Sequence, residues 1–197
     1  MDYLSLFFLA LLVAYLIVHF FNLRKNRQIS VTGYIHRQNE APAKEFRYGF
    51  YGTGHSGCGW VSVHNVNVML GRDIHPAKII SALEWIEAIC LGFVGTVPIA
   101  LRAYFFFRGD RTRFTRRMDQ IDVLAKEQVT SILGYLHQKG GHFAAIRWDG
   151  ENFWGYNMFS DGTGPYCMGS SISAFMEHRG YLHPQLIVVH PKKEKNP

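Results

Sequence analysis

Cysteine is scarce in this sequence, which contains only Cys58, Cys90 and Cys167. Three cysteines cannot all pair within one chain, and their spacing does not resemble a disulfide framework. Internal repeats are absent, and low complexity is limited to the closing PKKEKNP. These absences exclude the disulfide-rich secreted class and the repeat architectures, and they agree with a reducing compartment.

Acidic residues are outnumbered, with 15 Asp and Glu against 21 Lys and Arg, which gives a formal charge of +6. Such a balance suits an anionic membrane surface or a nucleic acid. The most basic stretch is RGDRTRFTRR at 108–117. The aromatic residues that precede it form an apolar block and do not alternate with the basic residues, which disfavours binding to nucleic acid. We expect no nucleic-acid partner, and we interpret this stretch as a solvated face that would also suit anionic lipid headgroups.

One long apolar run, Tyr3 to Phe21, is interrupted only by Ser5 and His19. A hydrocarbon core of about 30 Å needs about 20 such residues as a helix, so residues 3–21 are predicted to cross the lipid bilayer. A cleavable signal peptide is disfavoured because Asp2 precedes the run. Three basic residues follow it: Arg24, Lys25 and Arg27. The positive-inside rule then predicts a single-pass protein of the cell membrane with residues 28–197 in the cytoplasm.

A second apolar stretch, Ala88 to Phe107, carries a single charge, Arg102. Its glycines and Pro98 are more typical of a loop that joins two buried helices than of a second span. The chain therefore divides into an anchor with its basic flank (1–27), a polar stalk (28–45), one domain (46–191) and a basic tail (192–197).

Helical patterns precede strand patterns in the domain. Helices are predicted at 60–70, 76–89, 97–109 and 118–128, with Pro76 and Pro98 suited to first turns. Strands are predicted at 129–137, 142–148 and 151–157, followed by a Gly-rich loop, a helix at 171–180 and a strand at 185–190. This order predicts an α+β fold instead of a doubly wound sheet.

Cys58 lies between Gly57 and Gly59 at the start of the first predicted helix of the domain. Amide dipoles at a helix N-terminus favour a thiolate and lower the pKa of a thiol. The two glycines permit a tight turn and leave room for a substrate carbonyl, to which the Cys58 amide would donate as part of an oxyanion hole. The alternative is a small buried hydrophobe, as most free cysteines are.

A predicted hairpin brings a second pair of polar residues together. A two-residue turn at Asp149-Gly150 would place His142 opposite Asn157, with Cβ atoms about 5 Å apart. A four-residue loop, 149–152, keeps the two side chains on the same face. With Cys58 upstream, this arrangement supplies a nucleophile, a base and an orienting group.

These segments resemble the papain-like cysteine peptidases. The residues that carry the resemblance are Gly57-Cys58-Gly59, GTVPIALRAYFFFRG and GGHFAAIRWDGENFWGYN, and the best match within that family is to the double-glycine leader peptidases, which trim secreted peptides at the cytoplasmic face of bacterial exporters. The resemblance covers roughly residues 46–191. It implies a papain-like fold, Cys58 as nucleophile, His142 as base and Asn157 where many members carry Asp. It also implies a peptide or protein substrate, an exporter as candidate partner and no cofactor.

One position departs from the family. Such peptidases place an oxyanion-hole glutamine six residues before the cysteine, where this chain has Gly52. Thr53 is the candidate replacement donor, with Tyr51 and His55 as alternatives. The departure keeps open a degenerate domain that binds a peptide without cutting it, and the same nucleophile would also serve an acyl or amine transferase. A zinc site at His55, Cys58 and His64 is disfavoured because no second cysteine is near.

Overall fold

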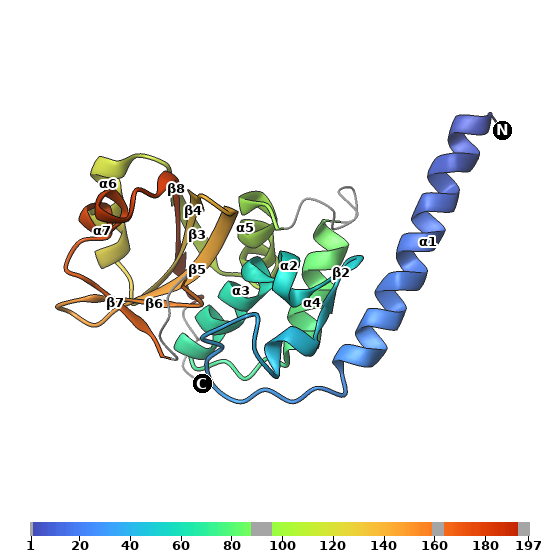
Figure 1. The fold of residues 1–197 in the computed structure, drawn as a ribbon, viewed down its shortest axis with the longest axis horizontal. Helices are drawn as coiled ribbons and strands as arrows, with labels where there is room; N and C mark the ends of the chain where they lie inside the picture. The colour runs from blue at the N-terminus through green and yellow to red at the C-terminus, as the bar shows by residue number, and fades with distance from the viewer. Residues whose placement is uncertain (1, 88–95, 159–163, 193–197) are drawn as a thin grey trace.

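The computed structural model describes residues 2–87, 96–158 and 164–192. A long N-terminal helix leads into a domain in which helices and an antiparallel sheet pack together (Figure 1). The helices are α1 (Tyr3–Asn26), η1 (Ala43–Glu45), α2 (Thr53–Ser56), α3 (Cys58–Met69), α4 (Pro76–Ile86), α5 (Pro98–Phe107), α6 (Met118–Lys126) and α7 (Ile172–Arg179).

The main sheet has six strands in the order β3-β8-β4-β5-β6-β7, and every neighbouring pair is antiparallel. Its strands are β3 (Arg111–Thr115), β4 (Thr130–His137), β5 (Gly140–Trp148), β6 (Phe153–Tyr156), β7 (Tyr166–Gly169) and β8 (Leu182–His190). A separate two-stranded sheet pairs β1 (Arg47–Tyr48) with β2 (Tyr51–Gly52). The predicted α+β class is confirmed.

The sheet is buried on both faces. Ile132 and Ala145 point into a core that also holds Trp60 of α3 and Leu101 of α5. The next residues along the strands, such as Leu133, belong to a second core beneath α6 and α7. Because side chains alternate between the faces of a sheet, burial on both faces explains why these strands read as continuous apolar runs.

Most predicted elements occur in the structure. Pro76 and Pro98 occupy first turns of α4 and α5, as expected. Two strands of the main sheet were not predicted: β3 lies within the arginine-rich stretch, and β7 follows the Gly-rich loop. The short strands β1 and β2 were not predicted either. The arginine-rich stretch is therefore partly an edge strand, and its Arg113 pairs with Glu127.

The segment 28–45 is not the spacer expected between membrane and domain. Ile35 and Ala43 are buried in the core that packs on α3. The side chain of Asn65 donates to the Ile35 carbonyl and accepts from the Ile35 amide, both at 2.8 Å. A polar segment without periodicity is typical of a stalk, but here the Asn65 side chain of α3 satisfies the main-chain groups of Ile35 and holds the segment against the domain.

The predicted anchor forms α1, and among the described residues it is the one helix long and apolar enough to cross a membrane. Its side chains are mostly exposed in its first half. Of the stretch Ala88 to Phe107, for which a second span was disfavoured, residues 98–107 form α5, and residues 88–95, including Cys90, lie outside the described residues. The basic tail is described only at its first residue, Lys192.

Candidate active site

A cleft of about 400 Å³ opens where α3, the β4–β5 hairpin and the segment after α1 meet. It brings together residues from distant parts of the chain, including Cys58, His142 and Asn157. The other lining residues are Arg37, Gln38, Asn39, Glu40, Gly54, His55, His137, Lys139, Gly141 and Met158.

Cys58 is the first residue of α3 and is partly exposed in the cleft. Its flanking glycines are required by close packing. A Cβ on Gly57 would lie 2.5 Å from the main-chain oxygen of Thr53, and a Cβ on Gly59 would overlap Thr96. The glycines therefore let α2 and the Thr96 segment approach the cysteine, in addition to any room they leave for a substrate.

The electrostatics of Cys58 differ from the expectation of a helix-activated thiolate. Burial raises the pKa of the Cys58 thiol, although hydrogen bonds from the main-chain amides of Phe143, Gly59 and Cys58 itself favour the thiolate. Desolvation of the charged sulfur outweighs these amides. In the substrate-free protein, Cys58 is therefore predominantly a thiol at neutral pH.

His142 lies in β5 with 6% of its surface exposed. Its Nε2 is 2.5 Å from the main-chain oxygen of Asn157. A carbonyl oxygen only accepts hydrogen bonds, so Nε2 carries the proton of the neutral ring and Nδ1 is the basic nitrogen. Burial lowers the pKa of His142 to about 4, with a smaller contribution from His137, while the bond to Asn157 acts in the opposite direction. His142 is therefore neutral at physiological pH and able to accept a proton.

Asn157 meets His142 through its main chain instead of its side chain. The strand pairing matches Trp148 with Phe153, which is the four-residue loop and not the two-residue turn. The Asp149 carboxylate accepts hydrogen bonds from the amides of Glu151 and Asn152 and so stabilises the wider loop. Asn157 follows the end of β6 with φ of 61°, a left-handed conformation that asparagine tolerates. This turn directs its carbonyl towards the imidazole.

Gln38 is the site residue that the sequence did not reveal. Its main-chain amide donates to Asn157 Oδ1 at 2.9 Å, and its side-chain oxygen accepts from Asn157 Nδ2 at 3.0 Å. Its own Nε2 donates to the carbonyls of Thr53 and Gly54, both at 3.2 Å. Gln38 thus links the Asn157 turn to the short helix before Cys58. No local pattern in the segment 28–45 marks it, because the contact spans 119 positions.

Thr53, the expected oxyanion donor, is fully buried and does not line the cleft. Its hydroxyl donates to the Phe46 carbonyl at 2.9 Å, and its amide donates to the same oxygen at 3.1 Å. This arrangement commits both of its protons to the main chain. The geometry therefore favours main-chain amides at the start of α3 over the Thr53 side chain.

The disfavoured zinc arrangement does not assemble in the described part of the chain. His64 is not among the residues that line the cleft, and its Nε2 lies 2.9 Å from the Gly33 carbonyl oxygen. No group of three or more His, Cys, Asp or Glu side chains that could hold a metal ion occurs among the described residues.

No known sequence family matches the chain, and no curated protein sequence matches it. The structure is similar to the peptidase domain of Streptococcus ComA, a bifunctional ABC transporter involved in a quorum-sensing pathway, with a TM-score of 0.51. The two sequences are 13% identical, and the match covers 70% of this chain and 93% of the ComA domain. The likeness shows that the chain has the fold of that peptidase domain.

Proposed function

We propose that the protein is a membrane-anchored cysteine peptidase that uses Cys58 as nucleophile, His142 as base and Asn157 as the group that holds the base. The observation that carries this proposal is the shared cleft, which gathers these three residues on the fold of a peptidase domain. The sulfur of Cys58 lies against the amide of Phe143, the residue after His142.

The protonation states favour general-base activation over a preformed ion pair. A substrate peptide entering the cleft places its carbonyl carbon near the Cys58 sulfur. Nδ1 of His142 accepts the thiol proton as the sulfur attacks, and the Asn157 carbonyl stabilises the resulting imidazolium through Nε2. The imidazolium then donates its proton to the leaving amine, which leaves a thioester on Cys58. Attack by water, with His142 again accepting the proton, releases the acid and restores the thiol.

The proposed substrate is a leader or precursor peptide that is cut after small residues. We base this on the fold shared with the ComA peptidase domain and on the double-glycine leader resemblance of the sequence. The apolar helix α1 would hold the domain at the cytoplasmic face of the membrane, beside an exporter.

The rival is a peptide-binding domain without turnover. Two observations favour it: the raised pKa of Cys58, and the absence of a glutamine at position 52. Losing one oxyanion donor costs about 10²-fold or more in turnover, so this departure bears directly on the rate.

The test uses the full chain in detergent or nanodiscs with a synthetic peptide that contains a Gly-Gly site. Cleavage by the native chain, lost in Cys58→Ala and His142→Ala but kept in the matched control Cys167→Ala, supports the peptidase. Binding of the intact peptide with equal affinity by the native chain and Cys58→Ala, without cleavage by either, would establish the rival instead.

A further inference from the structure

The anchor helix is not a free tether. Four polar residues, Tyr15, His19, Asn22 and Asn26, follow one another at intervals of four, three and four and therefore share one face of α1. All four are buried, with at most 7% of their surface exposed. Apart from Ser5, the remainder of the helix up to Phe21 is apolar and largely exposed. We call these four residues the polar stripe.

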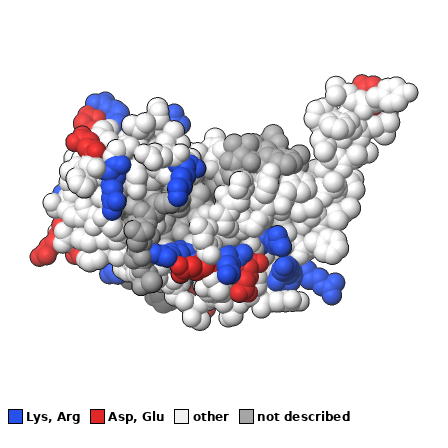
Figure 2. All heavy atoms as spheres, in the orientation of Figure 1, with Lys and Arg blue, Asp and Glu red and all other residues white. Residues whose placement is uncertain are grey.

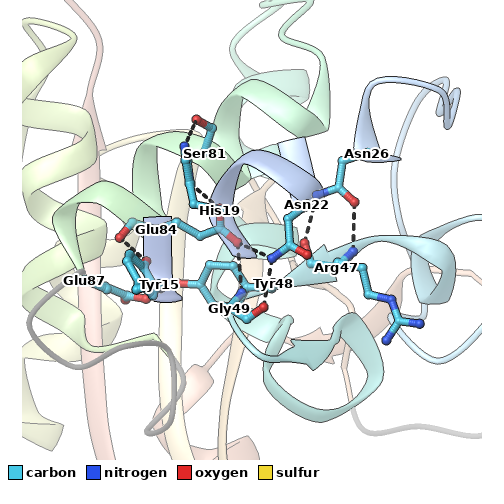
Figure 3. A network of polar contacts seen from close by, with 10 residues as sticks. All are labelled: Tyr15, His19, Asn22, Asn26, Arg47, Tyr48, Gly49, Ser81, Glu84 and Glu87. Atoms are coloured by element: carbon cyan, nitrogen blue, oxygen red, sulfur yellow. Dashed lines mark hydrogen bonds and ion pairs between the residues drawn. The ribbon is translucent and has the colours of Figure 1, made fainter. Parts of the chain in front are cut away.

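The polar stripe is bound by the domain (Figure 3). The Tyr15 hydroxyl donates to the main-chain oxygen of Glu84 in α4, and His19 Nδ1 pairs with the Glu84 carboxylate at 2.6 Å. Asn22 donates to the other carboxylate oxygen at 2.9 Å and to the carbonyl of Gly49 at 2.8 Å.

Further along the stripe, the Asn26 side chain donates to the Arg47 carbonyl at 2.8 Å and accepts from the Arg47 amide at 2.9 Å. The Gly49 amide completes the set by donating to the Glu84 carboxylate. A network of buried hydrogen bonds such as this one fixes the position of α1 relative to the domain, so α1 and the domain form one body.

This attachment limits how much of α1 is left to span a bilayer alone. The dozen or so residues from Tyr3 to Ala14 that precede the stripe reach about 18 Å at 1.5 Å per residue. A hydrocarbon core is about 30 Å thick. The whole run from Tyr3 to Phe21 approaches that thickness, but its last part, from Tyr15 onwards, is already packed against the domain. If the run is immersed, the domain surface beside it is immersed as well, to a depth of about 10 Å.

The surface beside the stripe suits lipid. Trp85 of α4 is 52% exposed and its ring lies 5.0 Å from that of His19. Phe50 is 40% exposed and lies 6.3 Å from the ring of Tyr15. In Figure 2 the visible surface of α1 is almost free of charged side chains between its two ends. The exposed basic residues Arg24, Lys25 and Arg27 sit at the end where headgroups are expected. Tryptophan at this level is typical of a membrane interface.

We propose that Trp85, Phe50 and the C-terminal end of α4 form a lipid-contacting surface, and that the domain enters the leaflet on its side of the membrane as one body with α1. The partner is the acyl-chain region of the bilayer. This inference rests on the proposed membrane anchor but not on the peptidase chemistry.

Trp85 provides its own probe, because the sequence up to Asn26 contains no tryptophan. The full chain is reconstituted in phosphatidylcholine vesicles with chains brominated close to the headgroup, and tryptophan quenching is measured after flotation. We expect strong quenching of the native chain, at least half of which is lost in Trp85→Phe. The matched control Trp154→Phe should keep it, because Trp154 belongs to β6, which lies at the opposite end of the domain from α1 (Figure 1). The inactive Cys58→Ala chain should be quenched like the native one.

A triple variant, His19→Leu with Asn22→Leu and Glu84→Gln, tests the stripe itself. It keeps α1 apolar and removes the bonds of His19 and Asn22 to the domain, while those of Tyr15 and Asn26 remain. We expect it to float with the vesicles while Trp85 quenching falls. Chains that float but show equal quenching with and without Trp85 would overturn the lipid-contacting surface and leave the anchor intact. Native chains that fail to float would overturn the anchor as well. Undiminished quenching in the triple variant would contradict the role of the stripe.

Discussion

The buried base makes the stability of the protein depend on pH in a predictable direction. The pKa of His142 is lowered from 6.5 to about 4 in the folded chain. Between these pH values the unfolded chain binds a proton at His142 that the folded chain does not bind. The contribution of neutral His142 to the free energy of unfolding is therefore complete above pH 6.5 and is lost as the pH falls towards 4. At about 1.4 kcal/mol per pKa unit, the loss amounts to about 3 kcal/mol. His142→Gln should lack this component.

The measurement is urea unfolding of the full chain in detergent, followed by tryptophan fluorescence, at intervals from pH 4 to pH 8. Glu87 has the opposite effect, because burial raises its pKa from 4.5 to about 7 and its contribution is lost as pH rises through that range. The difference between the native chain and His142→Gln isolates the histidine, and the exposed His178→Gln serves as matched control. Parallel curves for native and His142→Gln proteins would refute the assignment of a buried neutral base.

Three further predictions concern the thiol, the linking glutamine and the topology. Because burial raises the pKa of Cys58, the rate of its alkylation by iodoacetamide, followed by mass spectrometry, should increase about tenfold per pH unit from pH 5 to pH 8. A rate that is already constant at acidic pH would instead indicate a preformed thiolate. Gln38→Ala removes three side-chain hydrogen bonds, one to the Asn157 turn and two to the start of α2, each worth about 1 kcal/mol, and should lower kcat about tenfold or more. Lys44→Ala should leave kcat unchanged, and equal kcat values for the native chain and Gln38→Ala would show that Gln38 does not position the site. Single cysteines placed in 28–45 and in 192–197 should both resist a membrane-impermeant maleimide until cells are lysed, and labelling of the tail alone would restore a second span.

The sequence predicted those elements whose signals are local. Prolines in first turns marked α4 and α5, and the apolar runs of β4, β5 and β8 were recognisable because each strand is buried on both faces. The edge strand β3 was missed because its two exposed arginines alternate with a threonine and one phenylalanine, which is too short an apolar pattern to mark a strand.

Within the candidate site, strand alternation placed His142 and Asn157 near each other but could not tell which atoms meet. The left-handed turn at Asn157 presents its carbonyl to the imidazole and leaves its side chain to Gln38. Gln38 itself was beyond prediction, because a single polar residue in a segment without periodicity carries no signal of a contact made far along the chain. The thiol pKa also depends on burial, which no local motif reports.

Covalent trapping of the nucleophile tests the central claim most directly. The full chain is treated with a peptide chloromethyl ketone ending in Gly-Gly, and the modified residue is located by peptide mass spectrometry in native and His142→Ala proteins. The account predicts one adduct, on Cys58, whose formation at neutral pH is slowed strongly in His142→Ala. An adduct on Cys90 or Cys167, or equal labelling of Cys58 with and without His142, would contradict it.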